Sequence, residues 1–209
     1  MARLKSGVYG PLSGTLGPAI ASTWKGQPYL RSRPRKRTKK RGVNEKRNQD
    51  KFSQAHYWLQ PLLDFVRVGF FGYSPTVEGF NAAKSFCLKN AFIGEAGKQK
   101  IDPSLVQVSY GDLPLPSNIK MKRSGDYLLQ FTWDKKSDGG NKYDQAMLLA
   151  YDCETGQWNM QLPGQFRSSG GDELKLPPAR KQNYHVYIGF LAHDRSRQSH
   201  SVYLGMVST

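Results

Sequence analysis

The chemistry that this sequence offers most plainly is the binding of negative charge. Eight of the eleven residues from position 31 to position 41 are basic and none is acidic: Arg31, Arg33, Arg35, Lys36, Arg37, Lys39, Lys40 and Arg41. Five of the eight are arginines, whose planar guanidinium groups pair with phosphate oxygens and stack on aromatic rings. Like charges at this density repel one another, so the segment is predicted to stay exposed and to bind a polyanion.

The excess charge is confined to one end of the chain. Residues 1–51 contain 14 Lys and Arg against two acidic residues, a surplus of +12, whereas the remaining 158 residues contain 17 against 14, a surplus of +3. Nucleic acid, either DNA or RNA, is the predicted partner. Three other interpretations of the basic segment remain open: contact with another polyanion such as an acidic protein surface, a targeting role, and a solvated run of charge without function.

Two aromatic residues just upstream of the basic block add a second kind of contact. Trp24 and Tyr29 can stack on unpaired bases, or they can form the small apolar core of a hairpin. The predicted nucleic-acid-binding residues are Trp24, Lys25, Tyr29, Arg31, Arg33, Arg35, Lys36, Arg37, Lys39, Lys40, Arg41, Lys46 and Arg47.

No catalytic motif accompanies these residues. The sequence contains no Gly-x-Ser-x-Gly, His-Glu-x-x-His or Cys-x-x-Cys pattern. His185, His193 and His200 would approach one another if the last two strands pair, and Asp194 would then complete a metal site, but their spacing matches no tight ligand motif. We therefore predict a protein that is not an enzyme and that has neither a metal site nor a cofactor.

The composition also bears on the cellular location. No segment reaches the roughly 18 apolar residues of a membrane span, and glycines and prolines interrupt the N-terminal segment where an export signal would need an apolar run. We expect a protein of the cytoplasm or of the interior of a virion or particle, with no membrane partner. Cys87 and Cys153 are expected to be reduced core thiols.

Residues 1–43 are predicted to form a glycine-rich and basic arm. Ser6-Gly7-Val8-Tyr9-Gly10-Pro11 recurs as Ser13-Gly14-Thr15-Leu16-Gly17-Pro18, and this spacing of Gly and Pro favours turns in an extended chain. Residues 19–24 and 29–33 are predicted to pair as a hairpin that leads directly into the basic block.

Residues 44–95 change to a helical period. Apolar residues recur at i, i+3, i+4 and i+7 between Phe52 and Val66, so a helix that Pro61 kinks or divides is predicted. Ser74 as N-cap and Pro75 as first helical residue predict a further helix that ends at Gly94.

The period becomes two in the C-terminal half. A connector, residues 96–117, is predicted to contain a short strand at Val106–Tyr110. Residues 118–209 alternate apolar and polar side chains in short segments between turns, which predicts an antiparallel β-sandwich. Its predicted strands are 127–133, 145–152, 157–160, 173–176, 184–192 and 199–206.

This C-terminal segment resembles a fibronectin type III module. Leu129-Gln130-Phe131-Thr132-Trp133 is similar to the strand that carries the core tryptophan, and Met147-Leu148-Leu149-Ala150-Tyr151 is similar to the next strand. Leu176-Pro177-Pro178 followed by Tyr184-His185-Val186-Tyr187-Ile188 resembles the leucine–proline corner and the tyrosine-bearing strand. The resemblance implies a seven-strand scaffold, a kind of fold that hosts binding more often than catalysis.

The whole chain also resembles an uncharacterised family of proteins of similar length from Bacteroidota genomes and their mobile elements. The residues that carry the resemblance are Ser13-Gly14 through Gly17, Ser22-Thr23-Trp24-Lys25-Gly26, Tyr29-Leu30-Arg31-Ser32, Phe80-Asn81-Ala82-Ala83, Leu88-Lys89-Asn90-Ala91 and Ser201-Val202-Tyr203-Leu204-Gly205. The resemblance supports the architecture and implies no activity. The basic segment 31–41 departs from the family pattern.

The sequence therefore predicts an α+β protein. A turn-rich basic arm with a hairpin is followed by two or three helices and then by an antiparallel β-sandwich of the fibronectin type III or immunoglobulin-like kind. The predicted function is nucleic-acid binding that is largely independent of base sequence and involves no catalysis. The alternative is a structural subunit of a phage-like particle or filament, in which the arm contacts neighbouring copies of a homo-oligomer.

Overall fold

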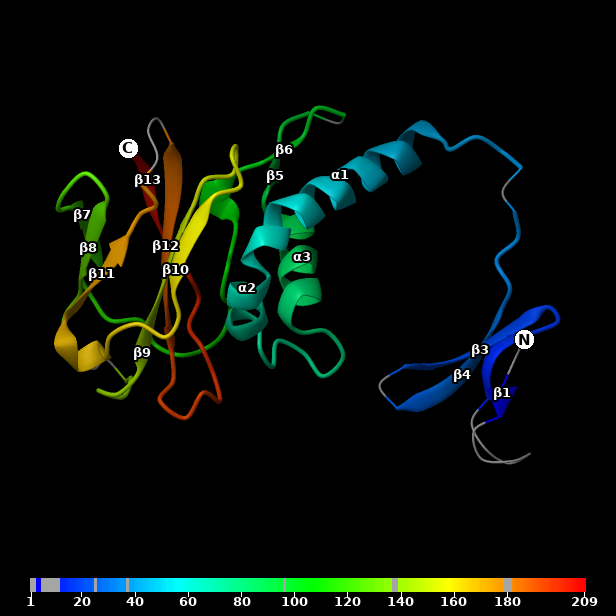
Figure 1. Ribbon diagram of the computed structural model, residues 1–209, viewed down its shortest axis with the longest axis horizontal. Coiled ribbons are helices and arrows are strands. Elements are labelled where there is room, and N and C mark those ends of the chain that lie inside the picture. The colour runs from blue at the N-terminus through cyan, green and yellow to red at the C-terminus, as the bar shows by residue number, and fades with distance from the viewer. Residues whose placement is uncertain are drawn as a thin grey trace. The chain divides into compact units, whose positions relative to one another are not determined.

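The computed structural model describes residues 3–4, 12–24, 26–36, 38–95, 97–136, 139–178 and 182–209 (Figure 1). The chain divides into two compact units, residues 1–42 and residues 43–209. The first contains a four-stranded sheet, and the second contains the helices, a four-stranded sheet, a three-stranded sheet and a two-stranded hairpin, so the fold is α+β as predicted. The division after Gly42 places the helical segment in the same unit as the sandwich.

The N-terminal unit contains a four-stranded antiparallel sheet with the strand order β1-β2-β3-β4. Its strands are β1 (Arg3–Leu4), β2 (Leu12–Leu16), β3 (Ala19–Trp24) and β4 (Gln27–Ser32). The predicted hairpin is present, but its second strand begins two residues earlier because Gly26, with φ 80°, turns the chain tightly enough for Trp24 to pair with Gln27. Pro28 is tolerated because β4 is an edge strand of the described sheet.

The glycine-rich repeat has a more regular structure than expected in its second copy. Most of that copy forms β2, and Gly17, with φ 55°, begins the turn into β3. The first copy, Ser6 to Pro11, lies outside the described residues.

Three helices open the C-terminal unit. They are α1 (Val43–Leu59), α2 (Leu63–Gly69) and α3 (Gly79–Asn90), with a 3₁₀ turn, η1 (Gln60–Leu62), between the first two. Pro61 lies in this turn and divides the helix as the sequence predicts, because its ring and missing N–H do not fit the interior of an α-helix.

The third helix begins later than predicted. Ser74 Oγ does accept a hydrogen bond from the Val77 N–H at 3.0 Å, as an N-cap would. However, Glu78 is extended with φ −142°, and Gly79 has φ 55°, so no helix runs on from Pro75. The prediction of a helix starting at Ser74 and Pro75 is therefore wrong.

The helix also ends before Gly94, because the chain enters a two-stranded hairpin instead. The hairpin is formed by β5 (Phe92–Ile93) and β6 (Lys100–Ile101), and Gly94 follows β5 with φ 102°. A second 3₁₀ turn, η2 (Pro103–Leu105), follows β6.

The strand predicted at Val106–Tyr110 is not formed. Val106 and Val108 are buried, which explains their alternation with polar residues, but the segment joins no strand ladder. Its backbone is held instead by other partners: the Val108 N–H donates to Ser201 Oγ at 3.0 Å, and the Tyr110 N–H donates to Gly69 O at 2.8 Å.

The remaining strands form two antiparallel sheets with the orders β10-β9-β12-β13 and β11-β8-β7. They are β7 (Lys120–Arg123), β8 (Leu128–Thr132), β9 (Gln145–Tyr151), β10 (Trp158–Gln161), β11 (Gly171–Lys175), β12 (Asn183–Leu191) and β13 (Val202–Ser208). These seven strands confirm the scaffold that the fibronectin type III resemblance implies. Trp133, the predicted core tryptophan, is buried and its ring meets that of Phe190 edge to face at 5.3 Å.

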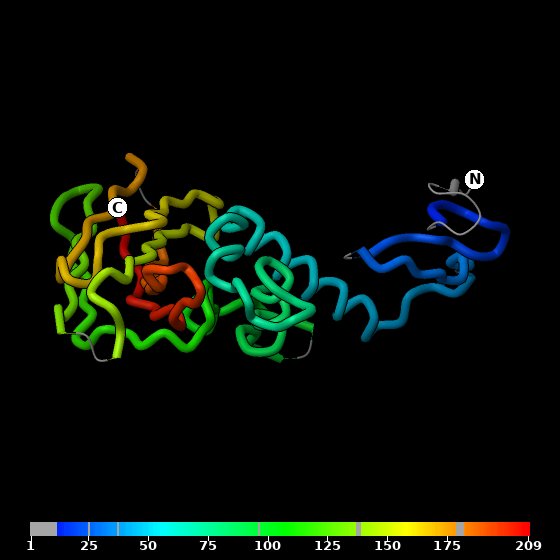
Figure 2. Tube along the Cα trace, turned by 90° about the horizontal axis from the view of Figure 1, so that it is seen from below, coloured from blue at the N-terminus to red at the C-terminus, as the bar shows by residue number. Residues whose placement is uncertain are grey.

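The four-stranded sheet is the middle layer of the C-terminal unit (Figures 1 and 2). Along β9, Met147, Leu149 and Tyr151 pack into a core shared with the helices, whereas Ala146, Leu148 and Ala150 pack into a core shared with the other sheet. A strand that is buried on both faces needs a continuous apolar run rather than alternation. The run Ala146–Tyr151 meets this need.

The two cysteines do not form a disulfide in the structure. Cys87 is buried, Cys153 is half-buried, both are free, and both pack at the core beneath the helices.

Among the described residues, no helix is long and apolar enough to cross a membrane.

Candidate nucleic-acid interface

The N-terminal unit carries positive charge with no negative charge to compensate it. Residues 1–42 contain 11 Lys and Arg and no Asp or Glu, whereas residues 43–209 contain 20 Lys and Arg against 16 Asp and Glu, a surplus of +4. No carboxylate side chain inside the first unit can therefore neutralise its cations. Their charge is left for a partner from outside the unit.

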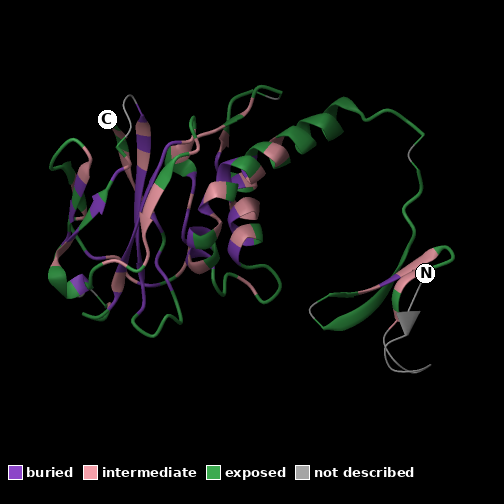
Figure 3. Ribbon diagram, in the orientation of Figure 1, coloured by how far each residue is buried: buried purple, intermediate pink, exposed green. Residues whose placement is uncertain are grey.

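The cations of the basic block lie along an edge strand and the extended chain that follows it. Arg31 belongs to β4, and the Arg33 N–H still donates to Pro18 O at 2.7 Å, so the chain follows the sheet one residue beyond the strand. The other described cations of the block lie in irregular chain ahead of α1: Arg35, Lys36, Lys39, Lys40 and Arg41. All of these residues are exposed (Figure 3). Lys25 and Arg37, which were also predicted to bind, lie outside the described residues.

Most of these side chains have no ion-pair partner among the described residues. Within the part of the chain that the structure describes, the following cations form no ion pair: Arg31, Arg33, Arg35, Lys36, Lys40, Arg41 and Lys46. A cation without an internal partner can approach a phosphate without first breaking an ion pair. This is the electrostatic state that sequence-independent contact with a nucleic-acid backbone requires.

The first turns of α1 carry acidic as well as basic residues. Residues 43–50 are exposed on every side of the helix (Figure 3). Lys46 and Arg47 lie there, and Arg47 Nη1 donates to Asn44 Oδ1 at 3.5 Å. Glu45 and Asp50 lie in the same turns and balance their charge locally. The uncompensated positive charge is therefore centred on the segment ahead of the helix.

Trp24 and Tyr29 lie on one face of the N-terminal sheet. Trp24 pairs with Gln27 and Tyr29 pairs with Ser22, and cross-strand partners point to the same face while successive residues alternate. Trp24 is 55 % exposed and Tyr29 is 42 % exposed. The interpretation of these two rings as a hairpin core is therefore wrong, and Ala21, on the opposite face, is the buried residue of the strand.

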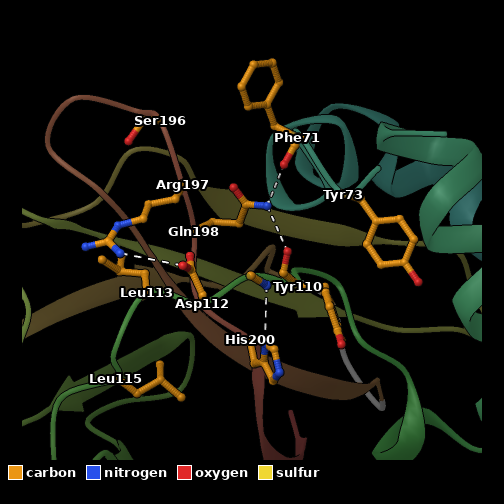
Figure 4. A pocket seen from close by; sticks show the side chains of 12 residues that line it. Phe71, Tyr73, Tyr110, Asp112, Leu113, Leu115, Ser196, Arg197, Gln198 and His200 are labelled. Atoms are coloured by element: carbon orange, nitrogen blue, oxygen red, sulfur yellow. Dashed lines mark hydrogen bonds and ion pairs between the residues drawn. The ribbon is translucent and has the colours of Figure 1, made fainter. Parts of the chain in front are cut away.

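A second candidate site, a cleft of about 900 Å³, lies in the C-terminal unit where the turn after α2, the connector and the β12–β13 loop meet (Figure 4). Its aromatic side is formed by Phe71, Tyr73, Tyr110 and His200. Opposite them, Arg197 Nη1 lies 3.7 Å from Asp112 Oδ2. Because this ion pair is neutral overall, the cleft suits a small polar ligand better than a phosphate backbone.

Gln198 ties the three segments of this cleft together. Its side-chain Nε2 donates to Phe71 O and to Tyr110 O, both at 2.8 Å (Figure 4). Its own backbone oxygen accepts from the Leu113 N–H at 3.1 Å. The side chain is buried, and its Oε1 has no hydrogen-bond partner among the described residues. The rim of the cleft is therefore fixed by a polar residue from the interior.

The three C-terminal histidines do not converge. His185 Nδ1 lies 2.9 Å from the Tyr203 hydroxyl, His193 Nδ1 lies 3.9 Å from Asp144, and His200 stacks on Tyr110 with ring centroids 4.4 Å apart. Among the described residues, no group of three His, Cys, Asp or Glu side chains is placed to hold a metal ion. The Gly111 N–H donates to His200 Nδ1 at 3.2 Å, so this histidine orders the cleft instead.

The comparison with known proteins concerns nearly the whole chain. Residues 11–205 match the profile described as a family of unknown function, DUF6266. The chain belongs to the DUF6266 family. This membership confirms the expectation of an uncharacterised family that extends over both the basic arm and the sandwich. No curated protein matches this DUF6266 chain.

Among solved structures, the crystal structure of chicken CNTN1 FN1–FN3 domains matches 47 % of the DUF6266 chain with 11 % sequence identity and a TM-score of 0.30. The match covers 33 % of the chicken chain, so the DUF6266 protein spans about a third of its length.

Sequence reasoning found the cations but missed the cleft of this DUF6266 protein. Charge density is visible in any window of the sequence, whereas Tyr73, Tyr110 and His200 come from three distant segments that only the fold brings together. One signal was available for the sheet: once the turn is placed at Gly26, alternation alone puts Trp24, Tyr29 and Arg31 on one face.

Proposed function

We propose that this protein binds nucleic acid through its N-terminal unit, without catalysis and largely without regard to base sequence. Cations from Arg31 to Arg41 contact phosphates, and the C-terminal unit acts as a folded scaffold. The observation that carries the proposal is the complete absence of acidic residues from residues 1–42, combined with the exposure of the described cations. DNA and RNA both present the required spacing of negative charge.

The charge is too concentrated to be a general property of the surface. Cations along one short extended segment can follow a phosphate backbone residue by residue, whereas cations dispersed over a globular surface reach it only a few at a time. Arginine is also better suited than lysine to two-oxygen contacts with phosphate. Arg33 and Arg35 therefore lie at the centre of the proposed contact.

A charge-matched pair of variants of the full-length protein tests the proposal. In the first, Arg33, Arg35, Lys36, Lys40 and Arg41 are replaced with Gln. In the second, five exposed lysines of the sandwich are replaced with Gln: Lys120, Lys122, Lys135, Lys136 and Lys175. Both variants lose the same net charge, so a difference between them reports position.

Binding to labelled DNA and RNA oligonucleotides is measured by fluorescence anisotropy at fixed salt. The first variant is expected to lose at least tenfold in affinity, and the second is expected to stay within about twofold of the natural protein, because only the first removes phosphate contacts. Equal losses in both variants would show that net charge alone attracts the nucleic acid, and would overturn the proposed site.

One observation favours the alternative of a structural subunit. Leu16 and Leu30 lie on the face of the N-terminal sheet that carries Ala21, and they are 54 % and 62 % exposed. Beyond β4, no further described strand pairs with the sheet. Such an edge can accept a strand from another copy of the chain.

Sedimentation of the protein after removal of nucleic acid distinguishes the two functions. Large assemblies would support a particle or filament subunit, which would also agree with an origin in a mobile element of Bacteroidota. A monomer that sediments faster only when DNA or RNA is added would support the nucleic-acid proposal.

A further inference from the structure

We propose that the face of the N-terminal sheet formed by Trp24, Tyr29 and Arg31 makes the protein a binder of single-stranded rather than double-stranded nucleic acid. This inference rests on the proposed function and names its substrate class. The two rings stack on unpaired bases, while Arg31 and the cations after it contact the phosphates.

The strand register places the three side chains together. In the β3–β4 ladder, Tyr29 is opposite Ser22 and Arg31 is opposite Ile20, and Trp24 is opposite Gln27. Residues 27, 29 and 31 of β4 share one face because a strand has a period of two. Their partners on β3 share the same face. The aromatic rings and the first cation of the basic block therefore form one continuous surface.

Both aromatic rings of this face are exposed. Trp24 is 55 % exposed and Tyr29 is 42 % exposed, while the described residues of this sheet contribute only Ala21 to the buried core. Exposed aromatic side chains that lie together on one face offer a flat apolar surface for a contact. In this unit they lie beside cations that no carboxylate of the unit can neutralise.

The spacing of the two rings suits the recognition of unpaired bases. Diagonal neighbours in an antiparallel ladder lie about 7–8 Å apart, so Trp24 and Tyr29 are far enough apart to receive different bases. A base in a duplex already has both faces covered by its neighbours, so only an unpaired base can stack on a protein ring. Stacking is also tolerant of base identity, which agrees with binding that is independent of sequence.

Electrostatics alone would give the opposite preference. A duplex has the higher charge density, and its counterion release per contact is larger than that of a single strand. A preference for single strands therefore cannot come from the basic segment and must come from the rings. A measured preference for single strands would therefore support stacking on the rings.

The experiment compares two fluorescein-labelled probes, an oligothymidylate of about 20 nucleotides and a duplex of the same length, each longer than the site of one binding module. The full-length protein and its variants Trp24→Ala, Tyr29→Ala and Leu30→Ala are titrated at the same salt concentration. Leu30 is the matched control, because it lies on the same strand and is 62 % exposed, but on the opposite face.

We expect Trp24→Ala and Tyr29→Ala each to weaken single-strand binding about 5- to 150-fold, the range reported by ring removal at stacking sites, with duplex binding changed less than twofold. Leu30→Ala is expected to change neither. If the aromatic variants weaken binding to both probes equally, or weaken binding to neither probe, the rings do not stack on bases. This inference is then overturned while the proposed function stands. If the unaltered protein binds neither probe, both fail.

A conservative variant separates stacking from damage to the small sheet. Trp24→Phe keeps a ring and is expected to retain most of the single-strand affinity that Trp24→Ala loses. Photo-crosslinking with 5-bromouracil in the oligonucleotide gives a second measurement, with crosslinks expected on Trp24 or Tyr29. Crosslinks found only in the C-terminal unit would contradict the proposed face.

Discussion

Trp24 and Tyr29 are diagonal neighbours across the β3–β4 ladder, and both rings are exposed on the same face of the N-terminal sheet. Arg31 extends that face into the basic segment. This sheet buries Ala21 and leaves both rings exposed, as the proposed stacking contact requires.

Replacing Gln198 with Ala is expected to destabilise the C-terminal unit by about 1–3 kcal/mol, because two partly buried hydrogen bonds are lost. These bonds join Gln198 Nε2 to the oxygens of Phe71 and Tyr110, each at 2.8 Å. Urea unfolding followed by circular dichroism measures the change. The control is Gln157→Ala at an exposed turn, and a loss below about 0.5 kcal/mol for Gln198→Ala, the size of an ordinary surface change, would show that these bonds do not hold the cleft.

Gly111 offers a steric test of the same region. A Cβ at this position would lie 2.0 Å from Gln198 O, so Gly111→Ala forces the connector away from the β12–β13 loop and should cost about 1–3 kcal/mol. Gly125→Ala is the matched control, because its Cβ would meet nothing closer than Leu128 Cβ at 3.9 Å. Equal thermal stability of the two variants would contradict the close approach.

His185 predicts a dependence of stability on pH. Burial lowers the pKa of this histidine, and Asp152 and Asp102 oppose that effect only in part. The unfolded chain, with a histidine pKa of about 6.5, binds the proton more readily than the folded chain. The stabilisation that the neutral His185 contributes is therefore complete above about pH 6.5, and it is lost as the pH falls toward the pKa of His185 in the folded chain. His185→Gln should reduce the fall of the unfolding free energy as the pH drops below about 6.5, relative to the natural protein. An unchanged slope would show that His185 is not the residue responsible.

The fold was predictable where local pattern and burial agree. The alternation from Tyr127 to Trp133 and the apolar run of β9 identified two sandwich strands, and Pro61 identified the break between α1 and α2. β7 was missed because Met121 is the only apolar residue among its four residues. Ser74 and Pro75 gave a false helix start, since the hydrogen bond that Ser74 accepts closes a turn without starting α3.

The candidate sites were predictable to different degrees. The basic residues needed only composition, because charge repulsion acts without a fold. Placing Trp24 and Tyr29 on one face required the position of the tight turn at Gly26. An error of one residue in that turn would put the two rings on opposite faces of the sheet. The cleft around Gln198 depends on segments more than 80 residues apart, as the separations of 88 and 127 residues between its hydrogen-bonded partners show.

The salt dependence of binding tests the central claim most directly. If about six cations of the N-terminal unit meet phosphates, log K for a single-stranded oligonucleotide should fall linearly with log[KCl] at a slope near −4. The variant that lacks Arg33, Arg35, Lys36, Lys40 and Arg41 should have a slope that is smaller in magnitude by about 3.5. A slope near zero for the natural protein, or the same slope in both proteins, would contradict the account.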